Sequence, residues 1–232
     1  LIKKSKKPIL YVGGGIIQSK ANNELFELAT KFNIPVVTTL MGRGAFPDGH
    51  ELCLEMPGMH GNYTATTSIQ NADLLIAIGV RFDDRVTANP SFFAQNAKVI
   101  HADIDPAEIG KVRDAQVPIV GDAKSVIKGL IEALGDEKLD TENWVSELKE
   151  MKTEFPLSYK QEDKGPLKVP YVLEELQKLT KEEAIVVAGV GQHQMWVSQH
   201  WNFTEPNTWL NSGGLGTMLS LIHISEPTRL LA

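Results

Sequence analysis

Short apolar runs alternate with amphipathic segments along residues 8–134. The runs at 8–12, 34–40, 74–79, 97–102 and 117–120 predict strands. The run at 74–79 predicts a strand buried on both faces, because it is short, continuously apolar and bounded by polar residues. Apolar residues at helical spacing (Leu25, Phe26, Leu28 and Ala29) predict a helix at 21–32, and further helices are expected at 64–71 and 124–134. The alternation is typical of a parallel sheet flanked by helices, so we predict an α/β fold.

Glycine and polar residues stand where these strands end. They are Gly13, Thr39, Gly79, Asp103 and Asp122. The carboxyl ends of parallel strands share one edge of a sheet, and the ligands of open α/β sheets bind outside that edge. A nucleotide-like ligand that lies across the edge explains the pattern.

The charged residues after strand 74–79 strengthen this interpretation. Arg81, Asp83, Asp84 and Arg85 follow the strand at once. A solvated loop whose charges pair with one another is the alternative. The glycines at 13–15 are a weaker signal, because they lack the G-x-G-x-x-G spacing of dinucleotide sites and also suit a tight turn.

Residues 45–62 form a long stretch with neither helical nor strand pattern. Loops of this length inside a compact domain are commonly functional or disordered. His60 stands among glycines in this stretch, where it can act on a ligand or have a structural role.

The second half of the chain has a different pattern. Residues 137–165 are strongly polar and predict a linker with one amphipathic helix, which presents Trp144, Leu148 and Met151 on one face. A second α/β unit follows, with a helix near 172–179, strands at 184–187 and 208–211, and glycine-rich turns after both strands. A glycine turn that leads into a helix suits a phosphate or diphosphate.

Composition narrows the function classes. The net charge of −6 argues against a nucleic-acid or anionic-membrane surface, and no apolar run reaches the roughly 18 residues of a membrane span. Cys53 is the single cysteine, which fits a reducing compartment, and we expect the cytoplasm. A filler role for Cys53 is more common than a reactive one. Since the chain opens on Leu1, we expect it to be a piece of a longer protein.

Three long motifs in the right order give the sequence a specific resemblance. They are VRFDDRVT at 80–87, VGQHQM at 190–195 and SGGLGTM at 212–218. Shorter matches stand at 39–42, 57–60 and 103–105. Together they resemble the catalytic subunit of the acetohydroxyacid synthase (acetolactate synthase) family, which belongs to the thiamine-diphosphate enzymes.

The resemblance implies a domain plan. Residues 1–136 match the Rossmann-like central domain that binds FAD, 137–165 the linker, and 166–218 the start of the diphosphate-binding domain. The flavin contacts implied by position are Gly14, Thr39, Leu40, Gly58, Met59, His60, Gly79, Arg81, Asp83, Asp103, Ile104 and Asp122. In this family the flavin takes no redox part in the main reaction.

The resemblance also implies a second cofactor, thiamine diphosphate. Gln192 and His193 match the residues that contact its diphosphate, and Gly216 matches the residue whose carbonyl holds its 4′-amino group. Met218 matches the bulky residue that bends the cofactor. Gly216 and Met218 are thus the predicted catalytic residues. The glutamate that protonates the pyrimidine and the ligands of Mg²⁺ are expected outside this sequence.

The implied reaction condenses pyruvate with a second 2-oxo acid in branched-chain amino-acid biosynthesis. The resemblance implies a homodimer or tetramer with a regulatory subunit, and no activity for these residues alone. The alternatives are a pyruvate oxidase or glyoxylate carboligase of the same architecture, or a nucleotide-binding module without chemistry. Two departures stand out: Gly189 replaces the family's common aspartate, and residues 219–232 read as a foreign tail.

Overall fold

The computed structural model describes residues 1–180, 184–214 and 216. Its first sheet contains β1 (Pro8–Val12), β2 (Val36–Thr38), β3 (Leu74–Ile78), β4 (Lys98–Asp103) and β5 (Val117–Val120). All neighbouring strands are parallel, in the order β2-β1-β3-β4-β5. The predicted parallel α/β fold is therefore confirmed, although β2 is shorter than the run at 34–40.

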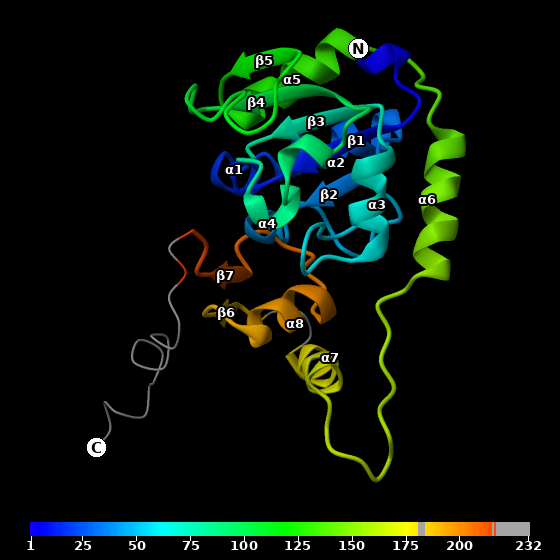
Figure 1. The fold of residues 1–232 in the computed structure, drawn as a ribbon, viewed down its shortest axis with the longest axis vertical. Helices are drawn as coiled ribbons and strands as arrows, with labels where there is room; N and C mark the ends of the chain where they lie inside the picture. Colours follow the sequence, from blue (N-terminus) through cyan, green and yellow to red (C-terminus); the bar gives the residue numbers. More distant parts are fainter. Residues whose placement is uncertain (181–183, 215, 217–232) are drawn as a thin grey trace.

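Helices cover both faces of this sheet (Figure 1). The longer ones are α2 (Asn22–Phe32), α3 (Tyr63–Asn71), α5 (Ala123–Leu134) and α6 (Glu142–Glu154). Short helices α1 (Gly14–Gln18) and α4 (Asp84–Thr87) follow β1 and β3, and single 3-10 turns lie at Ile2–Lys4, Leu40–Gly42 and Pro90–Phe92. Residues 45–62 contain no helix or named strand, as the sequence predicted.

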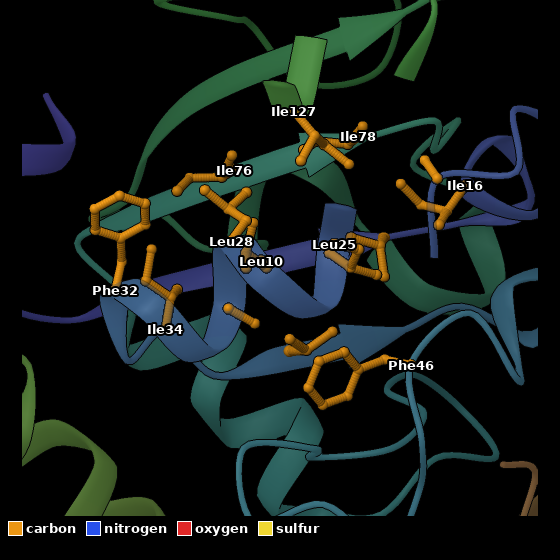
Figure 2. Close-up of a cluster of buried hydrophobic side chains, with 14 of the residues drawn as sticks. Leu10, Ile16, Leu25, Leu28, Phe32, Ile34, Phe46, Ile76, Ile78 and Ile127 are labelled. Carbon is orange, nitrogen blue, oxygen red and sulfur yellow. The ribbon is translucent and has the colours of Figure 1, made fainter. Parts of the chain in front are cut away.

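Strands β1, β2 and β3 are buried along their whole length because each face meets a helix layer. The edge strand β5 differs, since its residues alternate between half-buried and exposed. Leu10, Ile76 and Ile78 pack with Leu25 and Leu28 of α2 and with Ile127 of α5 (Figure 2). The opposite strand positions, among them Ile9, Leu75 and Val99, pack toward α3 and α6. A sheet covered in this way leaves mainly its strand ends free for a ligand.

Phe26 lies off the buried stripe of α2. The predicted face of Leu25, Phe26, Leu28 and Ala29 is wrong at Phe26: the buried residues are Leu25, Leu28, Ala29 and Phe32, and Phe26 is 41% exposed. A residue next to a buried one points about 100° away around a helix. Phe26 stacks instead on Phe46 of the long loop, with ring centroids 5.7 Å apart.

The predicted amphipathic helix of the linker is α6, and it packs on the first sheet. Trp144 and Leu148 are buried in the same cluster as Ile9 and Leu75, and the Trp144 indole N–H donates to the Pro8 carbonyl at 3.2 Å. Met151 is only half-buried. The helix layer over the first sheet therefore includes α6, although the polar composition of this segment predicted a linker.

A second, smaller unit follows the extended segment after α6 (Figure 1). It comprises α7 (Val169–Thr180), β6 (Val186–Ala188), α8 (Gln192–His200) and β7 (Trp209–Asn211), with β6 and β7 parallel. Trp201, Phe203 and Trp209 form its core with Val197 and Ala188. The predicted tail at 219–232 lies outside the described residues. Among the residues described, no helix is long and apolar enough to cross a membrane.

Candidate functional site

A cleft of about 1060 Å³ lies along the carboxyl edge of the first sheet. The ends of β1, β3 and β4 form one side, and α8 with the segment after β7 forms the other. The strand order reverses between β1 and β3, because the chain continues from β1 to β2 on one side and then crosses to β3 on the other. Ligands of doubly wound sheets bind at such a switch point.

The cleft brings together most of the residues assigned to the flavin from the sequence. Its lining includes Gly14, Thr39, Leu40, Met59, His60, Gly79, Arg81, Asp83, Asp103, Ile104 and Asp122. Gly216 lines it from the opposite side. Their contacts with a cofactor stay predictions. Met218, the other predicted catalytic residue, lies outside the described residues.

Gly58 has a different position from the one expected. It is not among the described residues that line the cleft; a Cβ built on it would stand 2.7 Å from the Arg85 carbonyl oxygen. Its φ of +95° is one that glycine adopts without strain. The close approach lets the Met59 N–H donate to the same carbonyl at 2.9 Å, so Gly58 positions the loop.

Gln192 and His193 also stand apart from this cleft. Both are exposed in the first turn of α8, and neither is among the described residues that line the cleft. Side chains on a helix change direction by about 100° per residue, and Gln194, Met195 and Ser198 are the ones that face the cleft. A diphosphate held by Gln192 and His193 would therefore occupy a separate place at this helix end.

Glycines let β1 and β3 approach closely at the base of the cleft. A Cβ on Gly13 would stand 2.4 Å from the Gly79 carbonyl oxygen, and one on Gly15 would stand 2.6 Å from the Gly79 Cα. Gly79 itself has a φ of +62°. The run at 13–15 is thus needed for backbone packing, and this packing leaves the strand ends open to a ligand.

The charged motif after β3 is anchored by the aromatic residue at its centre. Phe82 is buried, with its ring 5.5 Å from that of Tyr11 and 5.0 Å from that of His101. Its φ of +53° is uncommon for a residue other than glycine, and these ring contacts hold it there. Arg81 and Asp83 consequently turn outward to the cleft, where they lie 3.6 Å apart and half-exposed.

His101 supports the turn after β3 through a hydrogen bond. Its ring is fully buried, and Nε2 lies 2.9 Å from the Val80 carbonyl oxygen, so the bond requires the proton on Nε2. His101 has no role predicted from the sequence. Its place as an inward residue near the end of β4, next to the strand that carries the charged motif, is the signal that could have found it.

Three of the predicted carboxylates have local structural bonds as well. Asp83 caps α4 through the Arg85 N–H, and Asp122 caps α5 through the Ser125 N–H. Asp103 accepts from the Asp105 N–H at 2.9 Å. These bonds fix each carboxylate at a strand end, and a carboxylate in the position of Asp103 suits a ribose hydroxyl.

Tyr11 adds a neutral donor to the cleft. Burial raises the pKa of its hydroxyl far above the ordinary value, and the charge of Asp83 acts in the same direction. A phenol is neutral at physiological pH, and this environment keeps it so over a still wider range of pH. Tyr11 has no site role predicted from the sequence, since it lies within the apolar run of β1.

The second unit is joined to the cleft by specific hydrogen bonds. The Trp209 indole N–H donates to the Leu40 carbonyl at 3.0 Å, and the Gln199 amide donates to the His60 carbonyl at 2.7 Å. Leu40 and His60 both line the cleft from the first unit. The two sides are thus held against each other at both of these points.

Family models match both units of the chain. The model described as "Thiamine pyrophosphate enzyme, central domain" matches residues 1–130. The chain belongs to the thiamine pyrophosphate enzyme family. A second model of this family, "Thiamine pyrophosphate enzyme, C-terminal TPP binding domain", matches residues 189–220.

Curated members of this family resemble the chain over nearly its whole length. It is 54% identical over 221 residues to "Acetolactate synthase large subunit" of Corynebacterium glutamicum and 54% identical over 222 residues to "Acetolactate synthase" of Mycobacterium leprae. It is 48% identical to "Acetolactate synthase 1, chloroplastic" of Nicotiana tabacum. Each match covers 94% of this chain but only 33–36% of the relative. The resemblance to acetolactate synthase catalytic subunits is confirmed, and the chain spans about a third of their length.

Proposed function

We propose that these residues are the central part of an acetolactate synthase that condenses pyruvate with a second 2-oxo acid. The observation that carries the proposal is the cleft at the β1/β3 switch point, lined by the very motifs that resemble this enzyme family. The identity of 54% to a named large subunit supports the same reaction. These residues alone are expected to be inactive, since a thiamine enzyme needs its first domain as well.

The size of the cleft and the charges in it support FAD as the ligand. Its volume of about 1060 Å³ is just above the range of small-molecule sites, and the glycines at its base let the two strand ends pack closely below it. Arg81 supplies a cation for a diphosphate, and Asp103 supplies an acceptor for a ribose hydroxyl. In the proposed enzyme Arg81, Asp103 and the loop at Met59 and His60 hold the flavin in place.

Thiamine diphosphate is proposed to bind at the second unit, with Gln192 and His193 at its diphosphate. Their exposed position in the first turn of α8 offers free backbone N–H groups and a favourable helix dipole. Thiamine diphosphate supplies the carbanion-stabilising chemistry. Gly216 would present its carbonyl to the cofactor, and Met218 would support its bent shape. Mg²⁺ is proposed to have its ligands outside this chain.

The proposed organisation follows the motifs: a central domain at 1–136, a linker at 137–165, the start of the diphosphate-binding domain at 166–218 and a foreign tail at 219–232. In the whole protein we infer a homodimer or tetramer, a regulatory subunit and a place in the cytoplasm. The name "large subunit" carried by relatives supports the regulatory partner.

The experiment is an assay of acetolactate formation from pyruvate by the full-length parent protein. Activity is expected only with thiamine diphosphate, Mg²⁺ and FAD all present. The 232-residue chain serves as the matched control and is expected to bind FAD without forming acetolactate. A parent protein that oxidises pyruvate with flavin reduction, or that uses glyoxylate in place of pyruvate, would contradict the proposal.

A further inference from the structure

A fully buried ion pair lies behind the cleft, in the loop after β2. Both nitrogens of the Arg43 guanidinium fork bond the Asp48 carboxylate, at 2.8 Å and 2.7 Å. Both side chains are only 1% exposed. Arg43 also donates to the Thr38 hydroxyl at 3.4 Å. Exposed ion pairs of this chain, such as Lys149–Glu51, have no comparable enclosure.

The pair reaches across to the second unit. The second oxygen of Asp48 accepts the Phe203 backbone N–H at 2.7 Å, and the Asp48 N–H donates to the Phe203 carbonyl at 3.2 Å. The Arg43 guanidinium lies over the Phe203 ring, 5.6 Å from its centroid. Gly44 also packs closely against the second unit: a Cβ built on Gly44 would stand 2.5 Å from the Glu205 carbonyl oxygen.

Residues close in sequence to Arg43 and to Phe203 line the two sides of the cleft. Leu40 and Met41 precede Arg43 and line the cleft from the first unit. Trp209 and Gly213 follow Phe203 and line it from the second unit. Met41 meets this second segment directly, since the Asn211 amide lies 3.6 Å from its sulfur.

We propose that Arg43 and Asp48 are a positioning pair that sets the separation of the two sides of the cleft. Neither residue lines the cleft or touches a reacting group. They act through Phe203, which holds the segment that leads to Trp209, Gly213 and Gly214. The expected effect of the pair on FAD affinity rests on the proposed function, whereas its role in holding the two units together does not.

A buried charged pair suits this positioning role because the loss of either partner is strongly disruptive. Removing one partner leaves a buried charge without compensation, which is far more disruptive than loss of a surface ion pair. The fork geometry also admits one arrangement of carboxylate and guanidinium, so it defines the register between the units.

The test compares hydrogen exchange of two indole N–H groups in the 15N-tryptophan-labelled chain. The Trp209 indole bonds Leu40 across the cleft, whereas the Trp144 indole bonds Pro8 within the first unit. Asp48→Asn should speed exchange at Trp209 by about tenfold or more and leave Trp144 near its original rate. Arg43→Lys, which keeps the charge but loses the fork, should give a smaller change in the same direction and serves if Asp48→Asn fails to fold.

Two further variants make the comparison decisive. Glu51→Gln removes a carboxylate from the same loop and should change neither indole, because its side chain is 63% exposed. Arg43→Met combined with Asp48→Asn leaves no buried charge and should restore part of the Trp209 protection. Equal acceleration at both indoles, or no acceleration at either, would overturn the proposal.

An FAD titration of the same variants separates this inference from the proposed function. Asp48→Asn should weaken FAD binding by about tenfold, following the exchange rate at Trp209. If the unsubstituted chain binds no FAD, the flavin assignment fails while the exchange comparison still decides the role of the pair. FAD affinity unchanged in Asp48→Asn, with Trp209 exchange accelerated, would overturn the link to the cleft.

Discussion

Gly15 and Gly79 pack backbone against backbone where β1 and β3 end. A Cβ built on Gly79 would stand 2.7 Å from the Gly15 Cα, and Gly79 has a φ of +62°. The base of the cleft therefore depends on two residues without side chains. The same crossing places both strand ends within reach of one ligand.

Gly79→Ala should lower the free energy of unfolding by about 2–5 kcal/mol, from backbone strain and from crowding together. Gly135→Ala is the matched control, since its φ is +59° but nothing lies within 4 Å of the added Cβ. Its stability should fall only by the backbone strain, about 1–3 kcal/mol, since its φ of +59° and ψ of −123° suit glycine. Urea unfolding measures both, and equal losses would show that the crossing is not crowded.

Arg81→Ala should weaken FAD binding by about tenfold, because a charge-assisted hydrogen bond is worth roughly 1.5–3 kcal/mol. Lys3→Ala is the control: the Lys3–Glu137 pair is exposed to a similar degree, at 51% and 43%, as Arg81–Asp83, at 58% and 44%. Flavin fluorescence reports both affinities. If Arg81→Ala and Lys3→Ala have the same affinity for FAD, the charged motif is a solvated loop and not a flavin contact.

A chain that ends at Asp136 should be less stable than one that ends at Ser158, by about 3 kcal/mol or more. The reason is Trp144, whose buried ring covers the first sheet and whose N–H bonds Pro8. Trp144→Phe in the longer chain should lose only about 1 kcal/mol, since the apolar contact largely remains. Equal thermal stability of the two shortened chains would place the domain boundary at 136.

His200 should make stability depend on pH. Burial lowers its pKa from the ordinary value, while Glu174 and Glu55 act in the opposite direction. The Tyr159 ring packs against it, and the Tyr159 hydroxyl donates to Glu174 at 2.7 Å. The unfolded chain therefore takes up a proton at a higher pH than the folded protein does.

Stability should consequently fall as the pH drops below 6.5, the unfolded value, and stop falling below the folded pKa. Thermal melts between about pH 8 and about pH 5 measure this, with His200→Gln as the variant that removes the group. The difference in midpoint between the two proteins should change across that range. A constant difference would contradict the lowered pKa.

The parallel sheet could be predicted from sequence because its strands are continuous apolar runs with polar ends. Runs such as 74–79 are buried on both faces, and this burial leaves a clear pattern. The packing of α6 could not be predicted in the same way. Its segment is polar overall, and the contact of Trp144 with Pro8 joins residues far apart in the chain.

One side of the cleft could be predicted from the sequence, because the carboxyl ends of parallel strands share one edge of the sheet. Arg81, Asp83 and Asp103 follow this rule. The opposite side was not predictable, because it depends on how the second unit docks, through Phe203 and Trp209. For the same reason no role of Arg43 or Asp48 could be predicted from the sequence, since their partners become visible only in three dimensions.

The most direct test of the central claim is an equilibrium titration of the 232-residue chain with FAD, repeated with Gly14→Leu and Arg81→Ala. One FAD per chain is expected to bind. Binding should be weaker when a leucine side chain enters the cleft at position 14, and weaker when the cation at position 81 is removed. FAD binding that neither substitution alters, or no FAD binding by a folded chain, would contradict the assignment of this cleft to the flavin.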